Sequence, residues 1–192
     1  MIIGVCGLIG SGKGTVADIL VDEHGFEKVS FADSLKDAVS AVFGWPRALL
    51  EGDTEESRDF REQVDTWWAR KLDMPFLTPR IVLQQWGTEV CRNSFHNDIW
   101  ILSLERKLGD GNYIIPDTRF PNEIDIVQRM GGQVWRVKRG ADPEWFVGYQ
   151  NNGKAPPDIH ASEWAWARAV FDHVVDNEGT IDQLRESVKS LL

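Results

Sequence analysis

The residues from 7 to 15 carry the strongest chemical signal in the sequence. They read Gly-Leu-Ile-Gly-Ser-Gly-Lys-Gly-Thr and contain the pattern G-x-x-x-x-G-K. Glycines let the backbone curl so that several N–H groups point at phosphate oxygens, and a following helix adds the partial positive charge of its N-terminus. Lysine at this position reaches the outer phosphates as a point charge. The residues expected to hold the phosphates of a nucleotide are Gly10, Ser11, Gly12, Lys13, Gly14 and Thr15.

The residue after the lysine departs from the simplest form of this pattern. Gly14 stands where the simplest pattern has Ser or Thr, whose hydroxyl binds magnesium, and Thr15 comes next. We therefore assign Thr15 to magnesium, directly or through water. The G-K-G-T form resembles the loop of nucleoside monophosphate kinases such as adenylate kinase. The alternative is a glycine-rich turn with a chance lysine, but a strand before the loop and a helix after it favour the phosphate site.

A second group of chemical residues follows a predicted strand at 113–116. Asp117 lies at the strand end, where a carboxylate that organises magnesium belongs, and Arg119 could form a bidentate clamp on a phosphate. Glu123 falls in the first turn of the next helix, where it could orient Arg119 or accept a hydrogen bond from a sugar or base. A helix-capping cluster with a structural ion pair is the alternative for these three residues.

Two further cations could bind an anionic acceptor. An acceptor that is itself a phosphate needs positive groups for positioning and no general base. Lys36 falls in the first turns of a helix at the sheet edge where ligands bind, although a solvated helix lysine would look the same. Arg80 lies just inside a helix that Thr78 and Pro79 open. Gly87 is on the same face as Arg80, where its bare backbone would admit a nucleotide or another helix.

The segment around His160 and Glu163 has two interpretations. Together with the loop before it, this segment could close over a bound nucleotide. It could equally be a helix start with Ser162 as its cap. The other three histidines show no metal-ligand pattern.

The apolar pattern predicts the elements that must position these side chains. Strands are expected at 2–6, 28–31, 113–116, 134–138 and 174–175, and helices at 13–24, 32–43, 78–93, 99–108, 121–130 and 181–192. The last helix is expected to face inward with Ile181, Leu184 and Val188. Such alternation predicts an α/β, three-layer P-loop kinase fold with a central, mostly parallel five-stranded sheet flanked by helices.

The chain is expected to be a single P-loop kinase domain over residues 1–192. Within it we expect a helical substrate-binding excursion at about 44–110, whose part from 51 to 70 is highly charged. A lid or loop region is expected at about 139–162, where 151–157 is the most loop-like stretch.

Composition limits the partners. The formal charge of −9 excludes polymeric nucleic acid as an expected partner, because such binding relies on clustered Lys and Arg. Cys6 and Cys91 give neither a disulfide framework nor metal-ligand spacing, which indicates a reducing, cytoplasmic location. No signal peptide and no run of about 18 apolar residues is seen, so no membrane association is expected.

Together, these residues resemble the phage-type deoxynucleoside monophosphate kinase family. The matching blocks are the loop at 7–15, Phe-Ala-Asp-x-Leu-Lys at 31–36, Thr78-Pro79-Arg80, Leu83-Gln84, Gly87-Thr88-Glu89, Trp100, Asp-x-Arg-Phe-Pro-Asn-Glu at 117–123 and His160-x-Ser162-Glu163. Many kinases share the loop, whereas the 87–89 and 117–123 blocks together are much more specific.

The resemblance implies transfer of phosphate from ATP, with magnesium, to a deoxynucleoside 5′-monophosphate, and it implies a homodimer. The implied substrate-binding residues are Lys36, Arg80, Gly87, Trp100, Asp117, Arg119 and Glu123, with an acceptor-binding arginine for which Arg58, Arg61 and Arg70 compete. We select Arg61. The residues assigned to catalysis are Lys13, Arg80, Asp117 and Arg119, and Asp117 is the second candidate magnesium ligand after Thr15.

Two other functions stay open at this point. One is a P-loop kinase for another small molecule, such as dephospho-coenzyme A or a sugar acid. The other is a nucleotide-binding regulator without catalysis, against which the intact Lys13, Asp117 and Arg119 argue. The bases accepted and the choice between ribose and deoxyribose depend on a few pocket hydrogen bonds that the sequence does not define.

Overall fold

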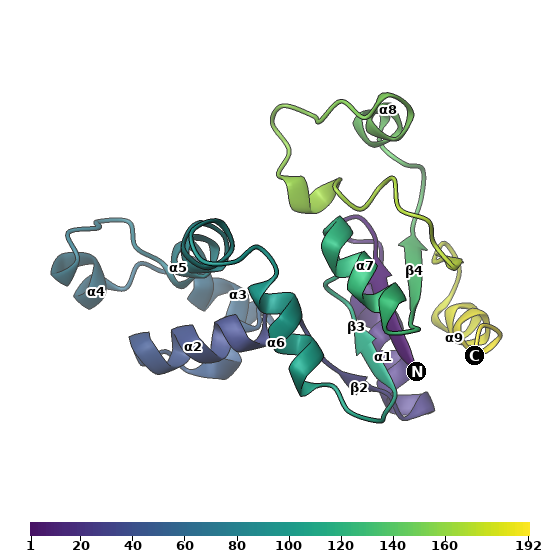
Figure 1. Ribbon diagram of the computed structural model, residues 1–192, viewed down its shortest axis with the longest axis horizontal. Helices are drawn as coiled ribbons and strands as arrows, with labels where there is room; N and C mark the ends of the chain where they lie inside the picture. The colour runs from purple at the N-terminus through teal and green to yellow at the C-terminus, as the bar shows by residue number, and fades with distance from the viewer. The chain divides into compact units, whose positions relative to one another are not determined.

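The computed structural model describes residues 1–192, which divide into two compact units (Figure 1). The loop unit comprises residues 1–30 and 108–192, and the helical unit comprises residues 31–107. The helical unit is therefore one uninterrupted insertion into the chain of the loop unit. None of the helices combines the length and the apolar character that crossing a membrane would require.

A five-stranded parallel sheet forms the centre of the loop unit. Its strands are β1 (Ile2–Cys6), β2 (Glu27–Lys28), β3 (Tyr113–Ile115), β4 (Gln133–Lys138) and β5 (His173–Asp176). They are ordered β2-β3-β1-β4-β5, and every neighbouring pair is parallel. The α/β class and the five parallel strands are as predicted from the sequence.

The two faces of the sheet are covered by different helices because side chains alternate along each strand. Ile3 and Val5 of β1 belong to one buried cluster with residues of α1 (Lys13–His24) and α9 (Ile181–Lys189). Gly4 points the other way: a Cβ at this position would lie 3.2 Å from Val127 of α7 (Pro121–Arg129). The sheet is thus the middle of three layers.

Helix α1 begins and ends where the sequence predicted. It buries Val16, Ala17, Ile19 and Leu20, and Gly25 ends it with a φ of 69°. This left-handed conformation is readily adopted by glycine, as expected for the residue after a helix. The prediction for the last helix was wrong in one respect, because Ile181 is 45% exposed while Leu184 and Val188 are buried. Ile181 is the first residue of α9, and the helix packs against the core only from Leu184 onward.

The region from 139 to 162 contains more regular structure than its sequence suggested. Helix α8 (Glu144–Asn152) fills its middle and ends at Gly153, and a short 3-10 helix η3 (Ala161–Glu163) lies at its end. Residues 151 and 152, which the sequence placed in its most loop-like stretch, belong to α8. Residues 153–160 contain no helix or strand.

Helices alone make up the helical unit. They are α2 (Asp33–Phe43), the 3-10 helix η1 (Arg47–Leu50), α3 (Glu55–Glu62), α4 (Thr66–Lys71), α5 (Pro79–Gln84), the π-helix η2 (Gln85–Asn93) and α6 (Ile99–Lys107). They surround a core of their own, in which the Phe43 and Trp45 rings stack with centroids 4.6 Å apart. Several of the many tryptophans therefore serve packing.

The helix predicted from Thr78 to Asn93 is present as two consecutive pieces. Thr78 caps it by accepting a hydrogen bond from the Ile81 N–H at 3.2 Å, with Pro79 as the first helical residue. From Gln85 the backbone continues as a π-helix to Asn93. A π-helix of this length is rare, and such segments are frequent at functional sites.

Candidate active site

The glycine loop leaves β1 and enters α1 through a backbone that needs glycine. Gly10 and Gly12 have φ angles of 79° and 99°, in the left-handed region. A side chain on Gly7 would lie 2.5 Å from the Val137 carbonyl oxygen. One on Gly12 would overlap the amide group of Asn177. The loop can therefore curl only with these residue types in place.

Asn177 follows β5, two strands away from β1 in the sheet, and it fixes the glycine loop from there. Its Nδ2 donates a hydrogen bond to the Ser11 carbonyl oxygen at 2.9 Å, and its backbone N–H donates to the Lys138 carbonyl oxygen at 2.8 Å. The sequence analysis missed this residue. The signal was a polar amide directly after β5, at the edge of the sheet where ligands bind.

Lys13 is turned back onto its own loop. Its Nζ donates hydrogen bonds to the carbonyl oxygens of Gly7 at 2.7 Å and Leu8 at 2.9 Å. The pKa of Lys13 is lowered to about 8, first by burial and then by the nearby positive charge of Arg119, while Glu163 opposes this shift. The loop thus encloses a poorly solvated ammonium group that an anion would stabilise.

Gly14 and Thr15 are exposed on the first turn of α1. A Cβ at Gly14 would meet no atom within 4 Å, so packing does not exclude Ser or Thr from this position. No group of three or more His, Cys, Asp or Glu residues that could hold a metal ion occurs in the chain. Magnesium usually needs only one or two protein oxygens besides water and substrate phosphates, and the Thr15 hydroxyl and the Asp117 carboxylate are of that type.

Asp117 follows β3, and a residue just after the adjacent strand β2 binds its carboxylate. The Ser30 hydroxyl, two residues after β2, donates a hydrogen bond to Asp117 Oδ2 at 2.6 Å. The next residue, Thr118, is buried and donates to the Ile115 carbonyl oxygen at 3.2 Å. The carboxylate of Asp117 therefore has a defined orientation at the carboxyl end of the sheet.

Glu123 serves the backbone around Arg119. Its Oε2 accepts hydrogen bonds from the N–H groups of Arg119 at 2.8 Å and Phe120 at 3.1 Å, and the residue is only 3% exposed. This is the helix-capping arrangement that the sequence analysis had kept as an alternative. It also fixes the main chain from which the Arg119 side chain extends.

Unlike its backbone N–H, which donates to Glu123, the Arg119 side chain contacts Ser162 and Glu163. Its Nη1 lies 3.2 Å from Glu163 Oε1 and 3.5 Å from Ser162 Oγ. His160 caps η3 by accepting a hydrogen bond from the Ser162 N–H at 3.3 Å, so the helix start is present but its cap is His160 rather than Ser162. Glu163, whose segment was expected either to close over a nucleotide or to start a helix, is thus the carboxylate partner of Arg119.

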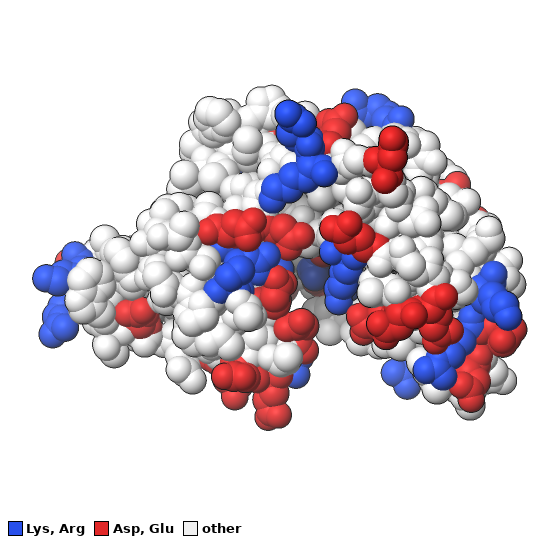
Figure 2. All heavy atoms as spheres, turned by 90° about the horizontal axis from the view of Figure 1, so that it is seen from below, with Lys and Arg blue, Asp and Glu red and all other residues white.

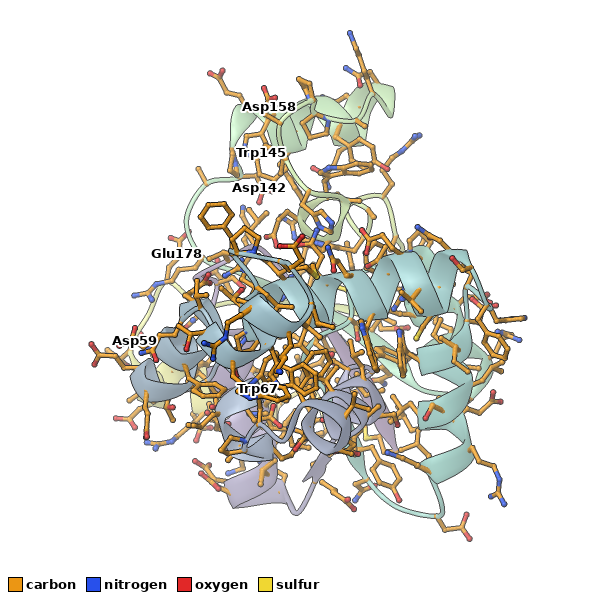
Figure 3. The ribbon with its side chains drawn as sticks, turned by 90° about the vertical axis from the view of Figure 1, so that its left-hand side faces the viewer. Asp59, Trp67, Asp142, Trp145, Asp158 and Glu178 are labelled. Atoms are coloured by element: carbon orange, nitrogen blue, oxygen red, sulfur yellow. The ribbon has the colours of Figure 1, made fainter.

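A pocket of about 220 Å³ adjoins the outer side of the glycine loop. It is lined by residues 8–11, by the end of β4 at residues 136–138, and by Arg139, Ala141, Asp142 and Pro143 of the connection to α8. Arg136 pairs with Asp142 and places its guanidinium carbon 4.9 Å from the Phe146 ring centroid. Figure 3 labels Asp142 and, at the start of α8, Trp145. The cation–π contact and the ion pair together tie this connection to the sheet.

In the helical unit, Lys36 and Arg61 converge on one residue, Glu51. Lys36 Nζ lies 2.5 Å from Glu51 Oε2, and Arg61 Nη1 donates to the Glu51 carbonyl oxygen at 3.3 Å. Lys36 is therefore no freely solvated lysine, because its side chain is 13% exposed and bound by a carboxylate.

The other sequence candidates of the helical unit have different surroundings. Arg80 is 62% exposed and pairs with Glu62 rather than with the groups around Glu51. A Cβ on Gly87 would lie 2.8 Å from Leu35 Cδ2 of α2, so the packing of another helix is sufficient reason for this glycine. Trp100 is buried and donates from Nε1 to the Gly87 carbonyl oxygen at 2.9 Å.

The structure thus gathers the predicted residues into two groups, one in each unit. The loop unit holds Lys13 and Arg119 with Glu163, and it holds Asp117 with Ser30. The helical unit holds Lys36 and Arg61 around Glu51. A curled glycine loop between the central strand of a parallel sheet and a helix, with a lysine inside the curl, defines a P-loop nucleotide-binding protein.

Comparison with known proteins identifies the family. The profile of the deoxynucleotide monophosphate kinases matches residues 75–188. A mimivirus protein that carries the same family name is 30% identical over 206 aligned residues, covering 99% of this chain and 95% of that protein. The chain belongs to the deoxynucleotide monophosphate kinase family, and it is accordingly an ATP-dependent phosphotransferase.

Bacteriophage proteins give weaker matches. The deoxynucleotide monophosphate kinase of Enterobacteria phage T4 is 28% identical over 134 residues, covering 67% of this chain and 46% of that protein. The deoxynucleoside-5′-monophosphate kinase of Escherichia phage T5 is 25% identical over 179 residues, covering 67% of this chain and 72% of that protein.

Solved structures resemble the chain only distantly. Dephospho-CoA kinase from Campylobacter jejuni gives a TM-score of 0.39 at 15% identity, covering 99% of this chain and 94% of that one. A gluconokinase from Sinorhizobium meliloti gives a TM-score of 0.42 at 13% identity, covering 98% and 89%.

Proposed function

We propose that this chain transfers the γ-phosphoryl group of ATP to the 5′-phosphate of a deoxynucleoside monophosphate, giving the diphosphate, by means of Lys13 and Arg119 in the loop unit. The observation that carries this assignment is the position of Lys13 inside the curl of the glycine loop, where burial and then the positive charge of Arg119 lower its pKa to about 8. Two partly desolvated cations beside inward-pointing amides suit a polyphosphate anion.

ATP is held by the glycine loop in this proposal. The N–H groups of residues 10–15 and the N-terminus of α1 bind the β- and γ-phosphates. Lys13 exchanges its two hydrogen bonds to the Gly7 and Leu8 carbonyl oxygens for phosphate oxygens. The ammonium is already close to the loop, so this exchange needs only a change of side-chain torsion angles.

Arg119 acts on the phosphoryl group that moves. Its guanidinium stabilises the charge that spreads over the equatorial oxygens during transfer. Glu163 is a positioning residue, because its carboxylate lies 3.2 Å from Arg119 Nη1 and is itself largely buried at 19% exposure. Glu123 fixes the backbone N–H of Arg119 at 2.8 Å.

Acceptor binding is assigned to the cations of the helical unit. Lys36 and Arg61 bind the 5′-phosphate, whose attacking oxygen is already ionised and needs no general base. Within the helical unit, Arg80, Gly87 and Trp100 are the further residues that the family resemblance implies for the acceptor.

Magnesium would be held by the Thr15 hydroxyl and the Asp117 carboxylate, directly or through water. When bound to ATP, magnesium neutralises charge on the β- and γ-phosphates. The Ser30 hydroxyl keeps the Asp117 carboxylate oriented through its 2.6 Å hydrogen bond. We further propose, as the family resemblance implies, a cytoplasmic homodimer that acts on free nucleotides.

An acceptor panel tests the proposed reaction. All deoxy- and ribonucleoside monophosphates, dephospho-coenzyme A and gluconate are offered with ATP and magnesium, and ADP release is measured. We expect turnover of at least one deoxynucleoside monophosphate and a loss of kcat of at least ~100-fold in Lys13→Ala. Turnover of a non-nucleotide alcohol with no turnover of any monophosphate would contradict the proposal. Binding of ATP without phosphorylation of any acceptor would indicate a regulator.

A further inference from the structure

The carboxylate of Glu51 lies at the centre of a charged cluster in the helical unit. Its Oε2 lies 2.5 Å from Lys36 Nζ, and its Oε1 accepts a hydrogen bond from Arg47 Nη1. Burial alone would raise the pKa of the Glu51 carboxyl, but the hydrogen bonds from Lys36 and Arg47 outweigh burial and hold this pKa below its ordinary value. The carboxylate is therefore charged and doubly bound at neutral pH.

Arg47 anchors Glu51 from the other side. Besides Glu51, which lies one helical turn later, Arg47 pairs with Asp33 at 3.1 Å and with Asp37 at 2.7 Å. The two aspartates of α2 already balance the charge of Arg47. Arg47 thus fixes the position of the Glu51 carboxylate, and Lys36 is the cation whose charge that carboxylate balances.

The main chain next to Glu51 is shaped for Arg61. Gly52 has a φ of 77°, and a Cβ at this position would overlap the Arg61 guanidinium. Arg61 Nη1 reaches the Glu51 carbonyl oxygen at 3.3 Å across this bare backbone. The residue pair Glu51-Gly52 therefore brings a carboxylate, a lysine and a second arginine together, and only the glycine permits the approach of Arg61.

We propose that Glu51 occupies the place of the acceptor phosphate in the nucleotide-free chain, so that it competes for Lys36 and sets the affinity for the deoxynucleoside monophosphate. This inference rests on the proposed function, because it requires the acceptor phosphate to reach Lys36. It adds a residue that determines acceptor affinity to the cations already assigned.

Charge balance gives the direction of the effect. Lys36 is mostly withdrawn from water and needs an anionic partner, which Glu51 supplies when no nucleotide is bound. A phosphate dianion on Lys36 would lie within a few ångströms of the Glu51 carboxylate, and this repulsion opposes binding. Removing the charge of Glu51 should therefore destabilise the free chain and strengthen acceptor binding.

The variant Glu51→Gln tests this inference, because Gln keeps the shape and can still accept from Lys36. Titration with the best acceptor of the panel and with inorganic phosphate is expected to give a Kd at least about fivefold lower than that of the parent chain. The KM for ATP should stay within about twofold, and the Tm of the nucleotide-free variant should fall. Glu51→Asp, which withdraws the carboxylate from Lys36, should shift the acceptor Kd in the same direction if the first variant does not fold.

Two further variants make the result decisive. Lys36→Met should weaken acceptor binding, and adding Glu51→Gln to it should strengthen binding by less than in the parent chain, since the competition for Lys36 is gone and only the direct repulsion of the phosphate remains to be removed. Glu105→Gln on α6, an exposed carboxylate, matches the change in net charge and should leave the acceptor Kd unchanged.

Each failure has its own signature. If Lys36→Met weakens acceptor binding but Glu51→Gln weakens it too or leaves it unchanged, the competition is wrong and the proposed function stands. If no monophosphate is bound or phosphorylated, both proposals are wrong.

Discussion

Lys13 is subject to opposing effects on its protonation state. Its ammonium donates to the Gly7 and Leu8 carbonyl oxygens, yet burial and Arg119 favour the neutral amine and bring its pKa down to about 8. The unfolded chain gives this lysine its ordinary pKa of about 10.4. Between these values the unfolded state binds more protons, so the contribution of Lys13 to stability rises with pH there and is least favourable below pH 8.

The variant Lys13→Met should remove this pH dependence. Relative to the variant, the parent chain should gain about 2–3 kcal/mol in free energy of unfolding as the pH rises from 7 to above 10. Urea denaturation of both proteins at several pH values measures this difference. A difference between the two proteins that is constant across this range would show that Lys13 has an ordinary pKa in the folded chain.

Arg119 and Glu163 should differ in their kinetic effects. Arg119→Ala should lower kcat by at least ~100-fold, because it removes a charge that acts on the transferring group. The kcat of Arg119→Lys should lie between that of the parent chain and that of Arg119→Ala, since lysine keeps the positive charge but cannot form the bidentate hydrogen bonds of a guanidinium. Glu163→Gln should lower kcat by less than Arg119→Ala does, and it should not lower kcat further when Arg119 is already replaced by Ala.

Steady-state kinetics with varied ATP measure these changes, and Glu186→Gln on the exposed face of α9 controls for net charge. If Arg119→Ala raised only KM, its assignment to the transition state would be wrong. An equal loss from Glu163→Gln in both backgrounds would mean that Glu163 does not act through Arg119.

Among single residues, the local patterns were predictable and the long-range partners were not. The glycine loop was recognised because its function depends on a contiguous backbone. Asn177 binds Ser11 across 166 positions of sequence, and Glu163 binds Arg119 across 44. A polar residue acquires such a role only when the folded chain brings two distant segments together, which no local pattern records.

At the scale of elements, two glycines inside helical segments should respond in opposite ways to the same substitution. Gly87→Ala should destabilise the chain by about 1–3 kcal/mol, because the added methyl group would crowd Leu35 Cδ2 at 2.8 Å. Gly148→Ala in α8 should stabilise it by about 0.5–1 kcal/mol, since a Cβ there meets no atom within 4 Å and alanine favours the helix. Thermal or chemical denaturation checks both, and destabilisation by both would refute the packing argument.

Elements with a single clear apolar stripe or run were predicted well. β1 and α1 have the bounds that were expected from the sequence. β2 was expected at 28–31 but spans Glu27–Lys28, at the edge of the sheet where it pairs only with β3. Helix α8 was missed because Gly148 and the two asparagines at its end favour turns locally, whereas the buried ring of Phe146 stabilises the helix through tertiary contacts.

At the scale of the whole molecule, the net negative charge should oppose the binding of a polyanion such as DNA. Figure 2 shows basic and acidic side chains interspersed on the face in view rather than gathered into one basic patch. With a net charge of −9, the chain should bind a short labelled DNA duplex no more tightly than about 10⁻⁴ M at physiological salt, while it binds ATP through the loop. Fluorescence anisotropy measures the duplex affinity, and a Kd well below about 10⁻⁴ M at physiological salt would contradict this expectation.

The division of the chain has a consequence for how such enzymes diversify. The cations Lys36 and Arg61, together with Arg80, Gly87 and Trp100, all lie in the single stretch from 31 to 107, while the glycine loop and Lys13 lie outside it. One recombination event with two breakpoints would therefore exchange these five residues together and leave the glycine loop and the predicted site residues from 117 to 123 in place.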